Sequence, residues 1–262
     1  MGQKSNPIAN RLGIIFGWKS LWVNNYNLYV NEDYLIRNYI NNRFINKYCI
    51  SSILIERIRN KTIITICTSK PAIVIGKKGK EVNFLRKKIK EIIIDNYNEN
   101  FYFLKNKIYI KNIFIYINII DILNPEIDSL LVAKNICRQI ESRISYKRAI
   151  KLSIITAIKK KIKGIKIKIS GRLNGAEMAR TETYKKGIIK LSTFRSNIDY
   201  SFYEANTKYG KIGIKVWIMK GEIYEIKKDF TKFYKSFFKK NDNFKFFINK
   251  KKNVKKNKKK IY

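Results

Sequence analysis

The chain has 262 residues, 45% of them hydrophobic, and carries 57 Lys plus Arg against 19 Asp plus Glu, a formal net charge of +38. The length allows one large or two modest domains, and so large a positive charge predicts a polyanionic partner, because neutralised phosphates release their counterions. The chain has no histidine and its three cysteines lie far apart, which excludes histidine-based catalysis and zinc sites, so we expect no catalytic residue, no metal and no cofactor.

The first part of the chain alternates between helical and strand-like patterns. Residues 1–19 are expected to form a polar, glycine-containing arm. Apolar residues at helical spacing predict a helix over 32–48. Two runs rich in β-branched residues, 53–58 and 62–68, flank a polar turn and predict a hairpin. Pro71 is placed to open a short helix, because its missing N–H costs nothing at a helix start.

The most informative segment is Gly-Lys-Lys-Gly, which lies between two segments with helical apolar spacing. Gly76 and Gly79 have no Cβ, so a sugar-phosphate backbone can approach the peptide closely. Lys77 and Lys78 supply positive charge, and the helix that follows, to about Ile94, offers unpaired N–H groups and the positive end of its dipole. G-x-x-G alone occurs in many turns, but in so basic a chain it predicts a phosphate-binding loop.

A third strand is expected within residues 113–120. The wider run 108–123 is apolar, but polar residues interrupt it and it is too short for a membrane span. We interpret it as a buried strand and predict no membrane partner. The first domain is therefore predicted as helix, strand, strand, helix, loop, helix, strand.

A second domain is predicted from Asn124-Pro125-Glu126, a sequence typical of a helix N-cap, first position and first turn. Apolar spacing predicts one helix from there to about Ile144 and a second helix through Ile158. Four strands are expected to follow, within the ranges 164–169, 183–191, 195–202 and 212–218. The first and last of these alternate strictly, so each buries one face. Both domains are thus predicted as α+β, with helices on one face of a small sheet.

The second of these helices carries three cations, Lys147, Arg148 and Lys151, within one turn. Like charges four residues apart repel by a few tenths of a kcal/mol in an isolated helix. A merely solvated basic face is the alternative, but it would tolerate interleaved acids, and none occurs from 147 to 168. We therefore favour contact with RNA. The segment 170–182, with two Gly and two Arg, also suggests an RNA surface, because arginine binds phosphate through a planar fork.

Several motifs follow one another along residues 1–224, namely MGQKSNP, RLGI, VIGKKGKEV, SGRLNGAEMARTE, IDY and YGKIGIKVWIMKGE. Together they resemble the bacterial family of small-subunit ribosomal protein S three. The resemblance implies a type II KH domain followed by a C-terminal two-helix, four-strand α/β sandwich. It also implies a place in the head of the subunit on 16S ribosomal RNA, beside other head proteins and the proteins of the pore where messenger RNA enters. Lys147, Arg148 and Lys151 correspond to the family's element that faces incoming messenger RNA and helps to unwind it.

On this basis the expected divisions are an arm at 1–19, a type II KH domain at 20–122 with an insertion at about 96–111, a C-terminal domain at 123–224 and a tail at 225–262. The last 36 residues hold 15 Lys and 2 Asp, and we expect the tail to be largely disordered. The arginines that we count as candidate contacts to ribosomal RNA are Arg143, Arg172, Arg180 and Arg195.

Three alternatives stay open at this point. Compositional drift toward Lys and Asn would explain part of the basicity, but not the scarcity of acids. A free KH-type RNA chaperone or decay factor would show the same loop and tail. A nuclease is not supported, because the sparse carboxylates form no obvious metal-binding cluster. We expect the chain in the 30S subunit of a bacterial cytoplasm or, alternatively, in an organelle ribosome encoded by the organelle.

Overall fold

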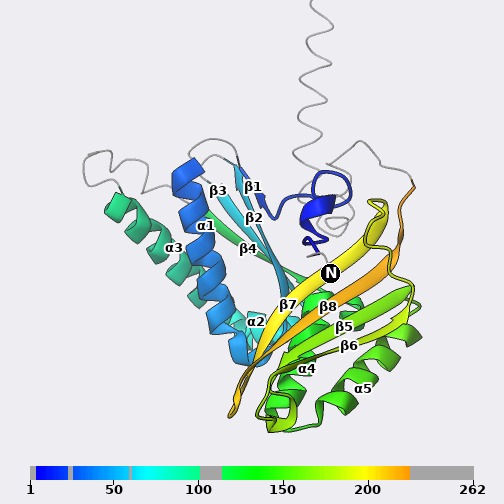
Figure 1. The fold of residues 1–262 in the computed structure, drawn as a ribbon. Helices are drawn as coiled ribbons and strands as arrows, with labels where there is room; N and C mark the ends of the chain where they lie inside the picture. The colour runs from blue at the N-terminus through cyan, green and yellow to red at the C-terminus, as the bar shows by residue number, and fades with distance from the viewer. Residues whose placement is uncertain (1–3, 23–25, 59–60, 101–113, 225–262) are drawn as a thin grey trace, which may run out of the picture. The chain divides into compact units, whose positions relative to one another are not determined.

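The computed structural model of the protein describes residues 4–22, 26–58, 61–100 and 114–224, which form two four-stranded sheets with helices on one face of each (Figure 1). The α+β class predicted from the sequence is confirmed. The predicted tail, 225–262, lies outside the described residues, and so does most of the predicted insertion.

The first sheet has the strand order β1-β2-β3-β4. Strand β1 (Ser20–Leu21) runs parallel to β2 (Ile50–Ile58), β2 runs antiparallel to β3 (Lys61–Thr68), and β3 runs parallel to β4 (Phe114–Asp121). The helices are α1 (Tyr26–Arg43), α2 (Pro71–Ile75) and α3 (Lys80–Asn100), and a 3-10 turn, η2 (Ile45–Lys47), follows α1. The predicted hairpin and the proline-initiated helix are confirmed.

The core of this first layer is built mainly from isoleucine. Leu85, Ile89 and Ile93 recur every fourth residue along α3, so one face of the helix is buried. They pack with α1 and the sheet into a single apolar cluster, to which Ile36, Ile40, Ile55, Ile64 and Ile66 also belong.

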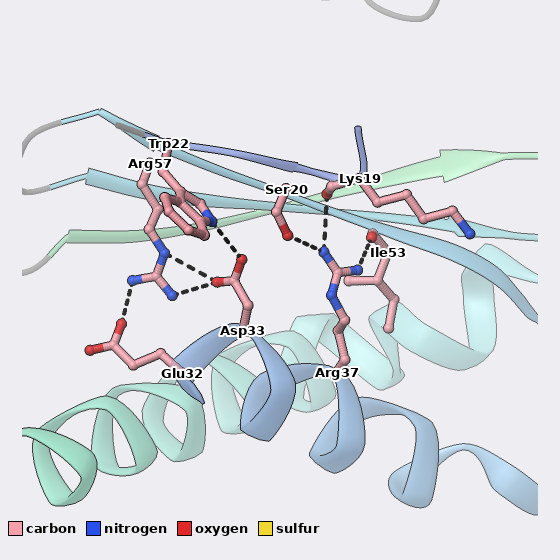
Figure 2. A network of polar contacts seen from close by, with 8 residues as sticks. All are labelled: Lys19, Ser20, Trp22, Glu32, Asp33, Arg37, Ile53 and Arg57. Atoms are coloured by element: carbon pink, nitrogen blue, oxygen red, sulfur yellow. Dashed lines mark hydrogen bonds and ion pairs between the residues drawn. The ribbon is translucent and has the colours of Figure 1, made fainter. Parts of the chain in front are cut away.

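Two arginines fasten α1 to the sheet (Figure 2). Arg57, on β2, bonds Glu32 and places its second terminal nitrogen 2.6 Å from Asp33 Oδ1. Arg37, on α1, donates to the carbonyl of Lys19 at 3.0 Å and to the Ser20 hydroxyl at 2.7 Å. Strand β1 is only two residues long, and it is held by a side chain of the helix as well as by its ladder with β2.

The second sheet has the order β6-β5-β8-β7, and every pair is antiparallel. Its strands are β5 (Gly164–Gly171), β6 (Arg180–Gly187), β7 (Ser196–Thr207) and β8 (Gly210–Glu222), with a 3-10 turn, η6 (Leu173–Gly175), after β5. Helices α4 (Ser129–Glu141) and α5 (Tyr146–Lys159) pack on one face of this sheet (Figure 1). The two-helix, four-strand prediction is confirmed.

The N-terminal segment, which was predicted as a polar arm, is held against the rest of the protein by a buried side chain. Arg11 ends a 3-10 turn, η1 (Ala9–Arg11), and its side chain is fully buried. Its guanidinium donates to the carbonyls of Ser196 at 2.8 Å, Leu191 at 2.8 Å and Thr193 at 2.9 Å. A single arginine therefore fixes residues around position 11 to the loop before β7.

The boundaries of α1 and α4 differ from prediction. Helix α1 begins at Tyr26 rather than at 32, because Leu28 extends its buried face by another turn, and it ends at Arg43. Helix α4 begins at Ser129, since the carboxylate of Asp128 accepts from the backbone N–H groups of Leu130 at 3.0 Å and Leu131 at 3.1 Å. Pro125 lies instead in a separate 3-10 turn, η5 (Pro125–Ile127).

The region around the third predicted strand also needs correction. Strand β4 lies at a sheet edge, and Ile115 is the only residue of its eight that is buried, so the prediction of a buried strand was wrong. Helix α3 continues to Asn100, beyond the predicted end near Ile94, so the first residues of the predicted insertion extend this helix. Residues 101–113 lie outside the described part of the chain.

Candidate nucleic-acid interface

The Gly-Lys-Lys-Gly segment forms a tight turn, η3 (Lys77–Gly79), between α2 and α3. Three of its residues have positive φ: Gly76 at 71°, Lys78 at 53° and Gly79 at 74°. This backbone lifts Lys77 and Lys78 into solvent, where both side chains are exposed. The first N–H groups of α3 follow directly, so exposed cations and a helix N-terminus meet at the predicted phosphate-binding loop.

The two glycines of the loop have different surroundings. A Cβ on Gly76 would lie 2.6 Å from Cγ of Glu81, whereas a Cβ on Gly79 would meet nothing within 4 Å. A ligand can therefore approach the α-carbon of Gly79 more closely than that of Gly76. Glu81 places a carboxylate near this cationic loop, and Arg43 of α1 pairs with it at 3.1 Å. No local sequence pattern predicts this pairing, because 38 residues separate Arg43 from Glu81.

Helix α5 has a buried apolar face and an exposed cationic face. Tyr146, Ala149, Ile150 and Ala157 are at most 3% exposed and pack into the core of the second layer. Lys147, Arg148 and Lys151 lie on the other face and are all exposed. The structure therefore brings these three predicted residues together on one rigid surface, because the helix beneath them is anchored over its length.

The start of α5 is tied to strand β6 through Glu182. The Tyr146 hydroxyl donates to Glu182 at 3.0 Å, the Tyr184 hydroxyl donates to it at 2.7 Å, and Arg180 lies 3.3 Å from it. The hydrogen bond from Tyr184, with smaller contributions from Tyr146, Arg180 and Lys147, lowers the pKa of Glu182. Glu182 therefore stays ionised beside the cations of α5.

Arg143 and Arg172 line one surface groove of about 630 Å³, between the α4–α5 connection, η6 and the β7–β8 turn. Arg172 closes its own loop, because its Nε donates to the carbonyl of Ala176 at 2.9 Å. Arg143 is exposed and has a positive φ of 62° where the chain leaves α4. Tyr146 and Tyr209 also line the groove, which thus combines cationic and aromatic groups.

The other two candidate arginines form ion pairs within the protein. Arg180 contacts Glu182 as above, and Arg195 lies 3.2 Å from Glu222, a carboxylate that Lys190 also approaches at 3.0 Å. Both guanidinium groups are about half exposed, with 53% and 54% of the side chain accessible. Part of their positive charge is therefore already compensated within the protein.

Comparison with known proteins resolves the family. The family model of the KH domain matches residues 35–127, and that of ribosomal protein S3, C-terminal domain, matches residues 136–218. The chain is 52% identical over 237 residues to small ribosomal subunit protein uS3 of Karelsulcia muelleri, covering 89% of this chain and 95% of that protein. The chain belongs to the uS3 family.

Other members of the uS3 family show the same degree of similarity. The uS3 protein of Flavobacterium psychrophilum is 50% identical over 86% of this chain and 82% of its own length. The uS3 protein of Bacteroides thetaiotaomicron is 47% identical over 88% of this chain and 89% of its own length. These are small ribosomal subunit proteins of bacterial type, and the resemblance inferred from the sequence motifs is confirmed.

Membership of the uS3 family gives the chain a structural role in the small ribosomal subunit and makes it a non-enzymatic, RNA-binding protein of translation. No helix in the described part of the chain is long and apolar enough to cross a membrane. Among the same residues, no group of three or more Cys, Asp or Glu side chains is arranged to hold a metal ion.

Two features of this uS3 chain were not found from the sequence. Glu182 and Tyr146 position the start of α5, but they lie 36 residues apart, and no local pattern joins them. Lys166 and Lys168 alternate with buried isoleucines in β5, which marks them as outward-facing. The alternation of residues 164–169 predicts one buried and one presented face, but it does not predict which strands pair beside these lysines.

Proposed function

We propose that helix α5 meets messenger RNA as it enters the small subunit and holds apart strands that would otherwise pair again. The observation that carries the proposal is the separation of faces on α5. Its apolar side is buried, while Lys147, Arg148 and Lys151 are exposed together. Cations on a rigid helix can bind successive phosphates, and little conformational entropy of the protein is lost because the helix is already ordered before binding.

The remaining cationic sites are proposed to bind the 16S ribosomal RNA that holds the protein in the subunit head, beside other head proteins and the proteins of the entrance pore. The loop formed by Gly76, Lys77, Lys78 and Gly79 is suited to a phosphate backbone, because its cations are exposed and Gly79 leaves space. The groove at Arg143 and Arg172 is suited to a second contact. Arg180 and Arg195 are weaker candidates, since acids already pair with them.

We also propose the division into a KH domain at 20–122 and a C-terminal domain at 123–224, in the 30S subunit of a bacterial cytoplasm. The two sheets support it, because the first ends at Asp121 and the second domain's first turn begins at Pro125. The family matches fall within or close to these limits.

Ribosomes that carry Lys147→Ala, Arg148→Ala and Lys151→Ala together test the role of α5. Translation of a message with a stable downstream hairpin should pause longer at the hairpin, whereas an unstructured message should be translated at the normal rate. The matched control changes Lys159, Lys160 and Lys161 to Ala, which removes the same charge from exposed positions at the other end of the helix. Unchanged pausing in the first variant, or equal pausing in both, would contradict the proposal.

The alternative of a free KH-type chaperone or decay factor is tested separately. A ribosomal protein should co-sediment with 30S particles through high salt, because its contacts go beyond simple phosphate binding, which weakens steeply with salt. Release of the chain from the particles by moderate salt would favour the alternative.

A further inference from the structure

The face of the second sheet that points away from α4 and α5 carries an unusual set of side chains. Ile165, Ile167 and Ile169 of β5 are fully buried against the helices, so Lys166 and Lys168 point to the opposite face. The strand register extends these two positions into two rows across the sheet. The first row consists of Lys185, Lys166, Trp217 and Tyr200. The second row, next to the first, consists of Thr183, Lys168, Lys215 and Phe202. We refer to these eight residues as the lysine face.

Like charges lie directly opposite one another on the lysine face. Lys166 is paired with Lys185, and Lys168 is paired with Lys215, in register. Such pairs destabilise a sheet, because the ammonium groups repel at the shortest cross-strand distance. None of the eight residues is acidic, so nothing within the two rows compensates the repulsion. Burial lowers the pKa of Lys166, and so do the neighbouring charges of Lys4, Lys168 and Lys185.

Aromatic rings lie among these lysines. The Lys166 ammonium is 5.3 Å from the centroid of the Trp217 ring, and the Lys215 ammonium is 5.8 Å from that of Phe202. Tyr200 packs against Trp217 with centroids 5.2 Å apart. Trp217 is only 9% exposed, whereas Phe202 is 47% exposed. Phe202 is therefore the ring of the three that is most available to a ligand.

One end of this sheet face is already covered by the protein itself. Ile189 and Leu191, in the loop before β7, pack on a small cluster formed by Ile198, Trp217 and Met219. Lys166 lies beside this cluster, over the ring of Trp217, whereas Lys168, Lys185, Lys215 and Phe202 are not part of it. Lys185, Lys215 and Phe202 are exposed. The structure therefore leaves a basic surface with one accessible ring.

From this arrangement we infer that the lysine face binds a single-stranded segment of RNA, whose phosphates lie along Lys166, Lys168, Lys185 and Lys215 and one of whose bases stacks on Phe202. This surface is separate from the cations of α5, which lie on the helical side of the same domain. Cationic tracks with interspersed aromatic rings are the means by which proteins bind single strands without reading their sequence. A protein partner fits less well, because lysine is depleted at protein–protein interfaces.

The first test uses the full-length chain and measures its binding to a uridine oligomer over a range of salt concentrations. The double variant Lys168→Gln, Lys215→Gln should bind more weakly, and its slope of log affinity against log salt should flatten by about 1.4, since about 0.7 is lost per single-stranded phosphate contact. The matched control is Lys87→Gln, Lys90→Gln, at two exposed lysines of α3. Equal losses in the two double variants would overturn the inference, because the effect would then be one of net charge alone.

The second test isolates the stacking contact. Phe202→Leu should weaken binding to the uridine oligomer about tenfold, while binding to duplex RNA of the same length stays unchanged. Phe202→Tyr should restore the affinity, because it keeps the ring. Equal affinities of Leu, Tyr and Phe at this position would contradict the stacking contact.

The third test locates the partner in assembled particles. A photoreactive phenylalanine derivative in place of Phe202, in small subunits with the α5 cations intact, should cross-link to RNA. Cross-links to another protein, or to residues 225–262 of this chain, would show that the face has a different occupant. Because this test leaves Lys147, Arg148 and Lys151 unchanged, its failure would not bear on the role proposed for α5.

Discussion

Arg57 and Asp33 form a buried ion pair, with 2.6 Å between the guanidinium and the carboxylate and 6% of each side chain exposed. The pair joins β2 to α1, and the other terminal nitrogen of Arg57, Nη1, bonds Glu32 (Figure 2). Removal of water from three charges is costly, and the cost is offset only while all three remain together. The two buried carboxylates of α1 therefore depend on Arg57 for their compensating charge.

Replacement of Arg57 by Met should lower the free energy of unfolding by about 3–5 kcal/mol, because it leaves two carboxylates buried without their partner. Urea denaturation of the full chain would measure the change. The control is Lys211→Met, which removes an exposed partner of Glu204 and should cost about 1 kcal/mol or less. Similar costs for the two variants would show that burial does not set the strength of the Arg57 pair.

Glu32 should make stability depend on pH. Burial raises the pKa of this carboxyl above its ordinary value of 4.5, against the opposing charge of Arg57. Because the folded chain holds this proton more tightly than the unfolded chain, the contribution of Glu32 to stability falls as pH rises above about 4.5. Denaturation of the natural chain and of Glu32→Gln should be measured between acidic and neutral pH. The free energy of unfolding of the natural chain should fall relative to that of Glu32→Gln as pH rises. The opposite trend would mean that the pairing with Arg57 outweighs burial.

Arg11→Lys should release the N-terminal segment. The ammonium group of lysine cannot reproduce the planar set of bonds to the carbonyls of Leu191, Thr193 and Ser196, and each buried carbonyl left unpaired costs roughly 1–3 kcal/mol. Amide hydrogen exchange at Ile15 and Phe16, whose N–H groups bond to the carbonyl of Arg11, should accelerate. Asn10→Ala is the control, because the Asn10 side chain bonds only to the exposed Ser5 hydroxyl in the described contacts. Unchanged exchange in Arg11→Lys would contradict the anchoring role.

The elements that the sequence predicted well are those whose pattern repeats locally. The alternation of isoleucine and lysine in 164–169 corresponds to β5, and the apolar spacing around Ile150 and Ala157 corresponds to the buried side of α5. The three cations of α5 were found for the same reason, since a helix with one buried face presents the other side to solvent.

The features that were missed depend on contacts between distant residues. Strand β1 has no strand pattern of its own and is fixed by Arg37, 17 residues after Ser20. Arg11 is a charged residue in a polar segment, and only the carbonyls some 180 residues later explain its burial. No local pattern in the sequence contains the contacts of Arg37 and Arg11. The start of α4 is a different case, because Asn124 and Asp128 are both suitable N-cap residues, and the structure shows that Asp128 accepts the hydrogen bonds from Leu130 and Leu131.

Substitutions at the two loop glycines should have unequal costs. Both have φ near 70°, so Ala is strained at either position. Gly79→Ala should cost about 1–2 kcal/mol from the backbone alone, because a Cβ there meets nothing within 4 Å. Gly76→Ala should cost more, because its Cβ would also lie 2.6 Å from Glu81 Cγ. Thermal unfolding would measure the loss of stability in each variant. Equal losses would show that the Glu81 side chain moves aside without cost.

Reversal of charge at Lys77 and Lys78 should weaken binding to every RNA sequence by the same factor. Both side chains are exposed in the turn, so we expect them to contact phosphates, which carry no sequence information. Binding of Lys77→Asp, Lys78→Asp to oligomers of differing sequence, at several salt concentrations, should show parallel losses and a flatter salt dependence. The control is the same change at Lys87 and Lys90, which lie farther along α3. A loss confined to some sequences would show that the loop reads bases as well as phosphates, and an equal loss in the control would assign the effect to net charge.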